Sequence, residues 1–326
     1  MPNQTLYGKA FEYACAKVIY ERYKVEQSVS IVESPQVITA KAFFDQLDSA
    51  KQNDLCLAAK AAIKIIERLE PQLQHPLHNI PLYLHLQEDA RGISGDVRDV
   101  LCIRKQNNWE IGISCKHNHN AVKHSRLSQT IDFGNSWFGR PCSQEYFKEI
   151  EPIFDRLSDL RRQGEDSNAP VLWRDITDKE SRIYIPILNA FLKELKRLDE
   201  SYPDEIPAKL VQYLLGGYDF YKVITDDARR CTRVEIVSFN GTLNKPAEGI
   251  ETLVRVPALK LPKHLYHMGI IHDSNNTIGI FCDEGWQFSM RIHNASSRVE
   301  PSLKFDIRLI SSPSNAYAQV EPWDEE

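Results

Sequence analysis

The feature that most constrains the fold is a pair of apolar segments separated by four polar residues. DVRDVLCIR occupies 96–104, WEIGISCK occupies 109–116, and KQNN lies between them. Two such runs joined by a short polar turn are typical of a β-hairpin. We therefore expect an antiparallel hairpin whose facing positions are symmetric about the point between Gln106 and Asn107.

This register places Asp99 opposite Ser114, with Lys116 one step further along the same face, because side chains of a strand alternate between its faces. A nuclease that uses Mg²⁺ needs carboxylate oxygens beside the scissile phosphate, and a cation that orients water or offsets charge. We interpret Asp99 and Lys116 as these groups, with Asp96 as the reserve metal ligand. Ordinary charges at a strand edge give the same short pattern, so the pattern alone does not decide.

Other segments indicate helices before residue 217 and strands after it. Apolar stripes at helical spacing predict helices at 5–24, at 143–163, 181–200 and 207–217, and a pair within 40–70. Alternation predicts a strand at 80–87, and the texture after Gly217 is β throughout, from YKVIT at 221–225 to SLKFDIRLI at 302–310, with TLVRVPAL at 252–259 among the expected strands. We expect an α/β (α+β) fold in two parts, 1–216 and 217–326.

Composition narrows the class of protein. With 326 residues and 42% hydrophobic side chains, the chain is long enough for a full core. Apolar runs are too short to cross a bilayer, and we expect no secretory signal and a cytoplasmic protein that does not bind membranes. Seven cysteines lack a CxxC pair, which favours buried free thiols over zinc ligation. The net charge of -5 does not by itself indicate a protein that binds nucleic acids.

The residues around the hairpin resemble a known family. GDVRDVLCIR…WEIGISCKHNHNAVKHSRLS, TIDFGNSWFG and FSMRIHNASSRVEPSLKFDIRLI are similar to the HaeIII family of type II restriction endonucleases, a variant of the PD-(D/E)xK nuclease superfamily. The resemblance implies a restriction-endonuclease-like core over 1–216, a mixed sheet flanked by helices, and target recognition in the β-rich part at 217–326. It also implies Mg²⁺-dependent double-strand cleavage of a short palindromic DNA site, GGCC in the best-known member.

The same resemblance assigns roles to residues. Asp99 corresponds to the metal-binding aspartate and Lys116 to the motif lysine, while Ser114 stands where the superfamily usually has Asp or Glu. Some enzymes with such a replacement take an acid from an N-terminal helix. Glu12, in GKAFEYA, borders the apolar stripe of the first predicted helix, and Gly8 leaves room beside it. We predict that Glu12 is a catalytic and metal-binding residue; a solvated boundary glutamate is the alternative.

Two donor-rich segments predict contacts with duplex DNA. Between residues 116 and 140, four lysines and arginines accompany a single aspartate. Donors of this kind position phosphates or read base edges. The first segment supplies Asn118, His119, Lys123, His124, Ser125, Arg126 and Ser128, and the second supplies Arg291, His293, Asn294, Ser296 and Arg298. With one segment beside the catalytic strand and one remote, we expect a clamp around the duplex.

A non-catalytic, sequence-specific DNA-binding protein on a decayed nuclease core is the competing hypothesis. Ser114 favours it, whereas Asp99, Lys116 and Glu12 together oppose it. A palindromic target favours a two-fold homodimer, and a monomer that nicks the two strands in turn is the alternative. A restriction-modification system also contains a cognate DNA methyltransferase, which protects the same site without needing to bind this chain.

Overall fold

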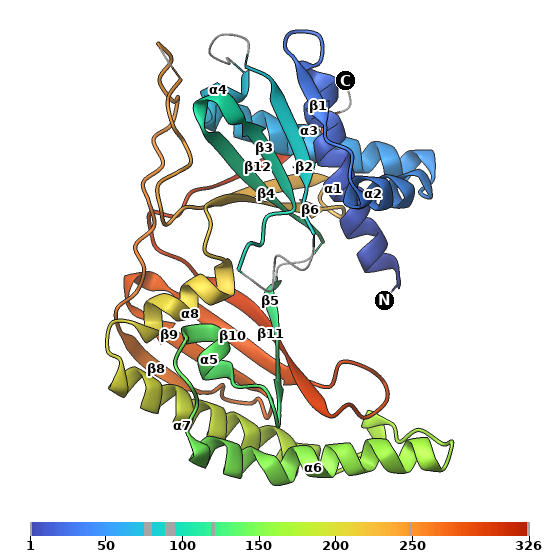
Figure 1. Cartoon of the computed structure of the whole chain (residues 1–326), viewed down its shortest axis with the longest axis vertical. Coiled ribbons are helices and arrows are strands. Elements are labelled where there is room, and N and C mark those ends of the chain that lie inside the picture. The colour runs from blue at the N-terminus through green and yellow to red at the C-terminus, as the bar shows by residue number, and fades with distance from the viewer. Residues whose placement is uncertain (1, 75–79, 89–94, 119–120, 248, 325–326) are drawn as a thin grey trace. The chain divides into compact units, whose positions relative to one another are not determined.

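The computed structural model describes residues 2–74, 80–88, 95–118, 121–247 and 249–324, which form two compact units (Figure 1). The first unit contains Met1–Asn120, Gly216–Leu259 and Asn315–Glu326, and the second contains Ala121–Leu215 and Lys260–Ser314. The change from helical to strand-like sequence that is expected near residue 216 coincides with the passage from a helix to a strand in the structure. Each unit, however, contains segments from both sides of it. Among the described residues, no helix is long and apolar enough to cross a membrane.

The first unit is built on a seven-stranded mixed sheet with helices packed against it. The strand order is β1-β2-β3-β4-β6-β7-β12; β1 pairs with β2, and β4 with β6, in parallel, and the other pairs are antiparallel. The strands are β1 (Val29–Ile31), β2 (Leu82–Leu86), β3 (Val100–Arg104), β4 (Trp109–His117), β6 (Phe220–Asp226), β7 (Cys231–Val237) and β12 (Ala318–Pro322). The helices are α1 (Pro2–Tyr23), α2 (Pro35–Asp45), α3 (Ser49–Leu69) and α4 (Pro71–Gln74).

One face of this sheet holds the core of the unit. Ile113, Tyr221 and Val234, from three neighbouring strands, are buried in one cluster with the apolar stripes of α1 and α3. These stripes are the ones predicted from helical spacing, and all their members are buried: Phe11, Ala14, Cys15, Val18 and Ile19 in α1, and Ala58, Ala61, Ala62, Ile65, Ile66 and Leu69 in α3. Since this face is apolar, the polar residues of the hairpin belong to the other face or to the strand ends.

The second unit carries a five-stranded antiparallel sheet in the order β5-β11-β10-β9-β8, together with helices from the middle of the chain. Phe305 of β11 packs against Phe191 of α7, with ring centroids 5.2 Å apart, so one face of the sheet is covered. The strands are β5 (Ala121–Ser128), β8 (Leu265–Ile270), β9 (Thr277–Cys282), β10 (Gln287–His293) and β11 (Ser302–Ser311). The helices are α5 (Phe133–Phe138), α6 (Gln144–Asp166), α7 (Ile185–Ser201) and α8 (Ile206–Leu215).

Two parts of the sequence-based prediction differ from this fold. The segment 252–259, expected to be a strand, has no regular secondary structure. Its apolar residues are typical of a strand, yet Leu253 and Val254 are exposed. Conversely, β5 was not expected, because its covered positions include Lys123 and Ser125, which contact a tyrosine and give no apolar alternation. The local pattern therefore predicts a strand that is absent at 252–259 and gives no sign of β5.

Candidate active site

The hairpin of β3 and β4 brings an acid and a lysine to one point. The Asp99 N–H donates to the carbonyl of Ile113 at 2.8 Å, which extends the register in which Val100 faces Ile113. Oδ2 of Asp99 accepts from the Cys115 N–H at 2.6 Å and from the Ser114 hydroxyl at 3.3 Å. Nζ of Lys116 lies 3.6 Å from the same oxygen. The predicted register, with Asp99 opposite Ser114, is confirmed.

Exposure separates the three side chains of this cluster. The side chains of Asp99 and Lys116 are 20% and 28% exposed, whereas Ser114 is 1% exposed. A substrate can therefore reach the carboxylate and the ammonium, while the serine is a buried support. Because a backbone N–H and a hydroxyl both donate to Asp99, its carboxylate is held in one orientation, as a metal ligand needs to be.

Asp96, the predicted reserve ligand, is already engaged by other groups. Its two oxygens accept from Nε and Nη2 of Arg98 at 2.7 and 2.8 Å, and Gln87 donates to Oδ2 at 3.1 Å. Nη1 of the same arginine binds Glu110 at 2.5 Å. A Cβ on Gly112 would lie 2.1 Å from Cδ of Arg98, so the glycine makes room for this arginine. In the structure Asp96 therefore forms an ion pair with Arg98.

Glu12 lies on the part of α1 that packs against the end of β4. The Tyr7 ring stacks on the His117 ring with centroids 4.9 Å apart, and Sγ of Cys15 lies 3.7 Å from Sγ of Cys115. Glu12 sits between these two contacts along the helix and is 7% exposed, with Lys9 3.0 Å from its carboxylate. This burial does not match the alternative of a solvated boundary glutamate.

The pKa of the Cys115 thiol depends on groups from both α1 and the hairpin. Its hydrogen bond with Cys15, followed by burial, raises the pKa of Cys115 well above its ordinary value, and the charges of Asp99 and Glu12 raise it further. Both carboxylates thus lie close enough to act on one side chain of β4. The raised pKa keeps the thiol protonated and excludes it as a nucleophile near neutral pH.

Carboxylate oxygens are what this site offers a metal ion. Among the residues that the structure describes, no group of three or more His, Cys, Asp or Glu side chains forms a metal-binding cluster. Mg²⁺, however, is commonly held by one or two carboxylates, with water and substrate phosphate completing its shell. Asp99 and Glu12 are the two acids that would form such a partial site, whereas a closed protein cage for zinc would need more ligands.

A second lysine, Lys222, lies beside Ser114 on the neighbouring strand of the sheet. Ser114 of β4 is paired with Lys222 of β6, and Lys222 is paired with Glu235 of β7. Nζ of Lys222 lies 3.4 Å from Oε2 of Glu235. Burial lowers the pKa of Lys222, and the positive charge of nearby Lys116 lowers it further, against the opposing effect of Glu235. Sequence reasoning missed Lys222, since nothing local in YKVIT shows which strand will lie beside it.

The end of β4 is fixed by contacts with the turn after β6. Nε2 of His117 lies 3.0 Å from Oδ2 of Asp227, and Asn118 donates to the same oxygen at 2.8 Å. The Asp227 N–H donates back to Oδ1 of Asn118, whose backbone φ is +51°. Asn118, predicted to contact DNA, is therefore a structural residue of this turn. His119, predicted with it, lies outside the described residues.

On β5 the predicted DNA contacts divide between the two faces of a strand. Nζ of Lys123 donates to the Tyr213 carbonyl at 2.9 Å and lies 3.6 Å from the centre of the Tyr213 ring, and burial lowers its pKa to about 8. Ser125 bonds the Tyr213 hydroxyl at 3.0 Å. His124 and Arg126 point the other way and are exposed. Lys123 and Ser125 thus face Tyr213, away from the exposed face of the strand.

The second donor-rich segment contains a folded turn. Nδ2 of Asn294 donates to the carbonyls of Ser296 and Arg298, both at 2.6 Å, and its Oδ1 accepts from the Glu300 N–H at 2.9 Å. The Ser296 hydroxyl binds the Arg298 carbonyl at 2.9 Å. These polar groups satisfy the backbone of the turn. Arg291 and His293 precede it on β10 and share a sheet with β5, on the other side of β11.

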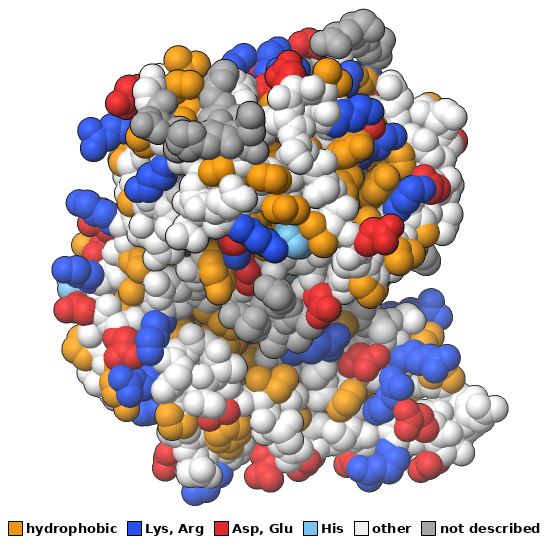
Figure 2. All heavy atoms as spheres, turned by 45° about the horizontal axis from the view of Figure 1, so that its top comes forward, with side chains coloured by type: hydrophobic (Ala, Val, Ile, Leu, Met, Phe, Trp, Pro, Cys, Tyr) orange, Lys and Arg blue, Asp and Glu red, His pale blue; other side chains and the backbone are white. Residues whose placement is uncertain are grey.

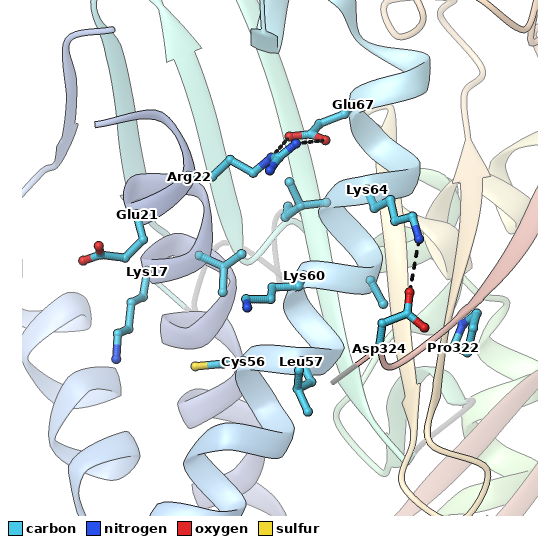
Figure 3. Close-up of a pocket in the computed structure, with 13 residues that line it drawn as sticks. Lys17, Glu21, Arg22, Cys56, Leu57, Lys60, Lys64, Glu67, Pro322 and Asp324 are labelled. Carbon is cyan, nitrogen blue, oxygen red and sulfur yellow. Dashed lines mark hydrogen bonds and ion pairs between the residues drawn. The ribbon is translucent and has the colours of Figure 1, made fainter. Parts of the chain in front are cut away.

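Surface charge and cavity shape do not single out the hairpin by themselves. Figure 2 shows acidic and basic side chains interspersed over the face in view. A cavity of about 600 Å³ lies between α1, α3 and the segment after β12 (Figure 3), and its lining contains none of the hairpin residues. Arg22 pairs there with Glu67, and Lys64 with Asp324. Paired charges of this kind indicate a structural groove.

Comparison with known proteins shows the family to which the chain belongs. Residues 8–313 match the sequence profile of the HaeIII restriction endonuclease family. The chain is 38% identical over 318 residues to the type II restriction enzyme HaeIII of Haemophilus aegyptius, a match that covers 98% of each chain. No solved structure matches. The chain thus belongs to the HaeIII restriction endonuclease family and is a type II restriction enzyme.

Proposed function

We propose that this enzyme hydrolyses both strands of DNA in a Mg²⁺-dependent reaction at a short palindromic site, with GGCC as the expected sequence. The observation that carries the proposal is the meeting of Asp99 and Lys116 at one carboxylate oxygen, with a separation of 3.6 Å. The 38% identity to the HaeIII enzyme over nearly the whole chain supports the choice of site. Cleavage of foreign DNA implies a cytoplasmic location and a methyltransferase that protects the host's copies of the site.

The residues take distinct roles in this proposal. Asp99 and Glu12 would hold the metal ion, and the Cys115 N–H and the Ser114 hydroxyl keep the Asp99 carboxylate oriented. A bound Mg²⁺ ion would supply Lewis-acid polarisation of the scissile phosphate. Lys116 would then orient the attacking water and offset the negative charge that develops at phosphorus. Ser114, with no charge, supports Asp99 and does not replace the acid of the usual motif.

Contact with the DNA backbone fits one polar face of the five-stranded sheet. Opposed residues of neighbouring strands point to the same face, and the pairing of β5, β11 and β10 places two histidines and four cations around one acid. Asp306 lies 3.4 Å from Arg291, 3.8 Å from His124 and 4.0 Å from Arg308. This polar sheet face consists of His124, Arg126, Ser128, Arg291, His293, Lys304, Asp306 and Arg308.

Excess positive charge is what suits this face to phosphate. Burial lowers the pKa of Lys304, and the like charge of Arg126 lowers it further, while the charge of Asp306 opposes both effects. One acid on this face thus serves four cations. A row of phosphates would relieve that repulsion. We assign target recognition to the β-rich part after residue 217, whose strands β8–β11 form this sheet with β5.

A plasmid digest with matched variants tests the proposal. We expect discrete fragments with Mg²⁺, none with EDTA, and a loss of roughly 100-fold or more in Lys116→Ala, as for other removed transition-state contacts. Sequencing the fragment ends gives the site and the cut position. Retarded but uncut DNA with the wild-type protein would instead support the non-catalytic DNA-binding alternative. Ends at another sequence would refute GGCC alone.

A further inference from the structure

Four polar residues lie side by side across the sheet, one just before β3 and one each in β4, β6 and β7. Asp99 faces Ser114 in the hairpin register, Ser114 is paired with Lys222, and Lys222 with Glu235. Residues opposed across neighbouring strands project from the same face of a sheet. Lys222 therefore shares a face with Asp99 and Ser114, and it is a diagonal neighbour of Lys116, which is paired with Ile224.

The charge of Lys222 is only partly balanced within this row. Its side chain is 7% exposed, and its ammonium lies 3.4 Å from Glu235. The same carboxylate also accepts from Arg233 at 2.8 Å. A single acid thus serves two cations, and the next cation along the face is Lys116. The positive charge of Lys116 helps to lower the pKa of Lys222.

Stability alone gives little reason for a lysine at this position. Buried ion pairs contribute little net stability, because desolvating the charges offsets their attraction, and apolar side chains of similar volume often serve as well. The neighbours at alternate positions of β6 on this face, Phe220 and Ile224, are indeed apolar and buried. A lysine between them places a positive charge beside the candidate active site.

We propose that Lys222 is a positioning residue for DNA cleavage, held by Glu235 in the row of Asp99 and Ser114, where its ammonium group repels that of Lys116 toward Asp99. The inference rests on the proposed function of Lys116. It also accounts for the serine at 114. A carboxylate there would lie between Asp99 and Lys222, would neutralise the repulsion, and would draw Lys116 away from Asp99.

The test compares Lys222→Met with Lys222→Arg. Losing the ammonium should lower kcat about 10- to 100-fold, as for other residues that orient catalytic groups, with little change in KM. Lys222→Arg keeps the charge and should restore most of kcat. Calorimetric titration of the DNA-free protein with MgCl₂ adds a second readout. Removal of a nearby positive charge should leave Mg²⁺ affinity equal or tighter, whereas structural damage to the site would weaken it.

Arg233→Met is the matched control, because it removes a cation from the same carboxylate at a half-exposed position, and it should leave kcat near the wild-type value. Urea unfolding and circular dichroism verify that the variants fold. Wild-type kcat in Lys222→Met, or parallel losses of kcat and Mg²⁺ affinity that arginine does not rescue, would overturn the inference. Lys116→Ala separates the two proposals: if it cuts normally, the proposed function of Lys116 fails; if it is inactive while Lys222→Met is normal, this inference alone fails.

Discussion

A Glu12 variant tests whether α1 supplies the acid that is missing at Ser114. Glu12→Gln changes charge with little change of shape, so we expect cleavage to fall roughly 100-fold while the protein stays folded. Glu21→Gln, at an exposed position on the same helix, is the control and should cut normally. Calorimetry with MgCl₂ should show weaker binding for the Glu12 variant only. Full activity in Glu12→Gln would leave Asp99 as the single acid of the site.

At the level of residues, the sequence predicts the hairpin register, because side chains of a strand alternate between its two faces. Asp99 and Lys116 followed from strand alternation and a symmetric turn, and the structure has that register. The sequence did not show that Arg98, two residues after Asp96, binds both oxygens of its carboxylate. The sequence does not predict that Lys222 lies beside Ser114, because this depends on a parallel pairing between segments far apart in the chain. Non-local contacts of that kind leave no trace in a local pattern.

At the scale of an element, the two faces of β5 provide a matched pair of variants. Arg126 is exposed on the polar sheet face, whereas Lys123 points to Tyr213 on the covered face. Arg126→Ala should weaken binding of a site-bearing duplex in Ca²⁺ and should reduce the slope of log affinity against log salt by about 1. Lys123→Met should leave affinity and slope unchanged. Equal effects of the two variants in fluorescence anisotropy would refute the assignment of this face to DNA.

The end of α3 carries a buried acid that links it to β6. Oε1 of Glu70 accepts from the Tyr221 hydroxyl at 2.6 Å and from the Asn244 N–H at 2.7 Å, and burial raises the pKa of Glu70 to about 7. The folded protein therefore keeps a proton that the unfolded chain loses above its ordinary pKa of 4.5. Stability from this group is full below about pH 4.5, falls as the pH rises to about 7, and is level beyond.

Glu70→Gln mimics the protonated acid and should remove this dependence. The shift from 4.5 to about 7 corresponds to roughly 3 kcal/mol of unfolding free energy. We expect the variant to be more stable than the wild type at pH 8 and nearly equal to it at pH 5, as measured by urea unfolding. Glu26→Gln, at an exposed position after α1, should follow the wild type at both values. A Glu70 variant that is less stable at pH 8 would show that the buried acid is ionised and stabilising.

At the scale of the whole molecule, the division into units was the least predictable feature. The change from helices to strands near residue 216 is visible in the sequence, and helix α8 does end at Leu215. Yet β6 and β7 join the sheet of the first unit, while β5, from before the change, joins the sheet of the second. The pattern of apolar residues indicates whether a segment is a helix or a strand. Which sheet a strand completes depends on long-range packing instead.

The proposed palindromic target leads to a prediction about the number of chains that cut it. A palindrome presents the same contacts on both strands, so two copies related by a two-fold axis can each place an Asp99–Lys116 site on one strand. We expect sedimentation of the protein with a GGCC duplex in Ca²⁺ to give two chains per duplex. Supercoiled plasmid should pass to the linear form without accumulating nicked circles. One chain per duplex together with a persistent nicked intermediate would show that a monomer cuts the strands in turn.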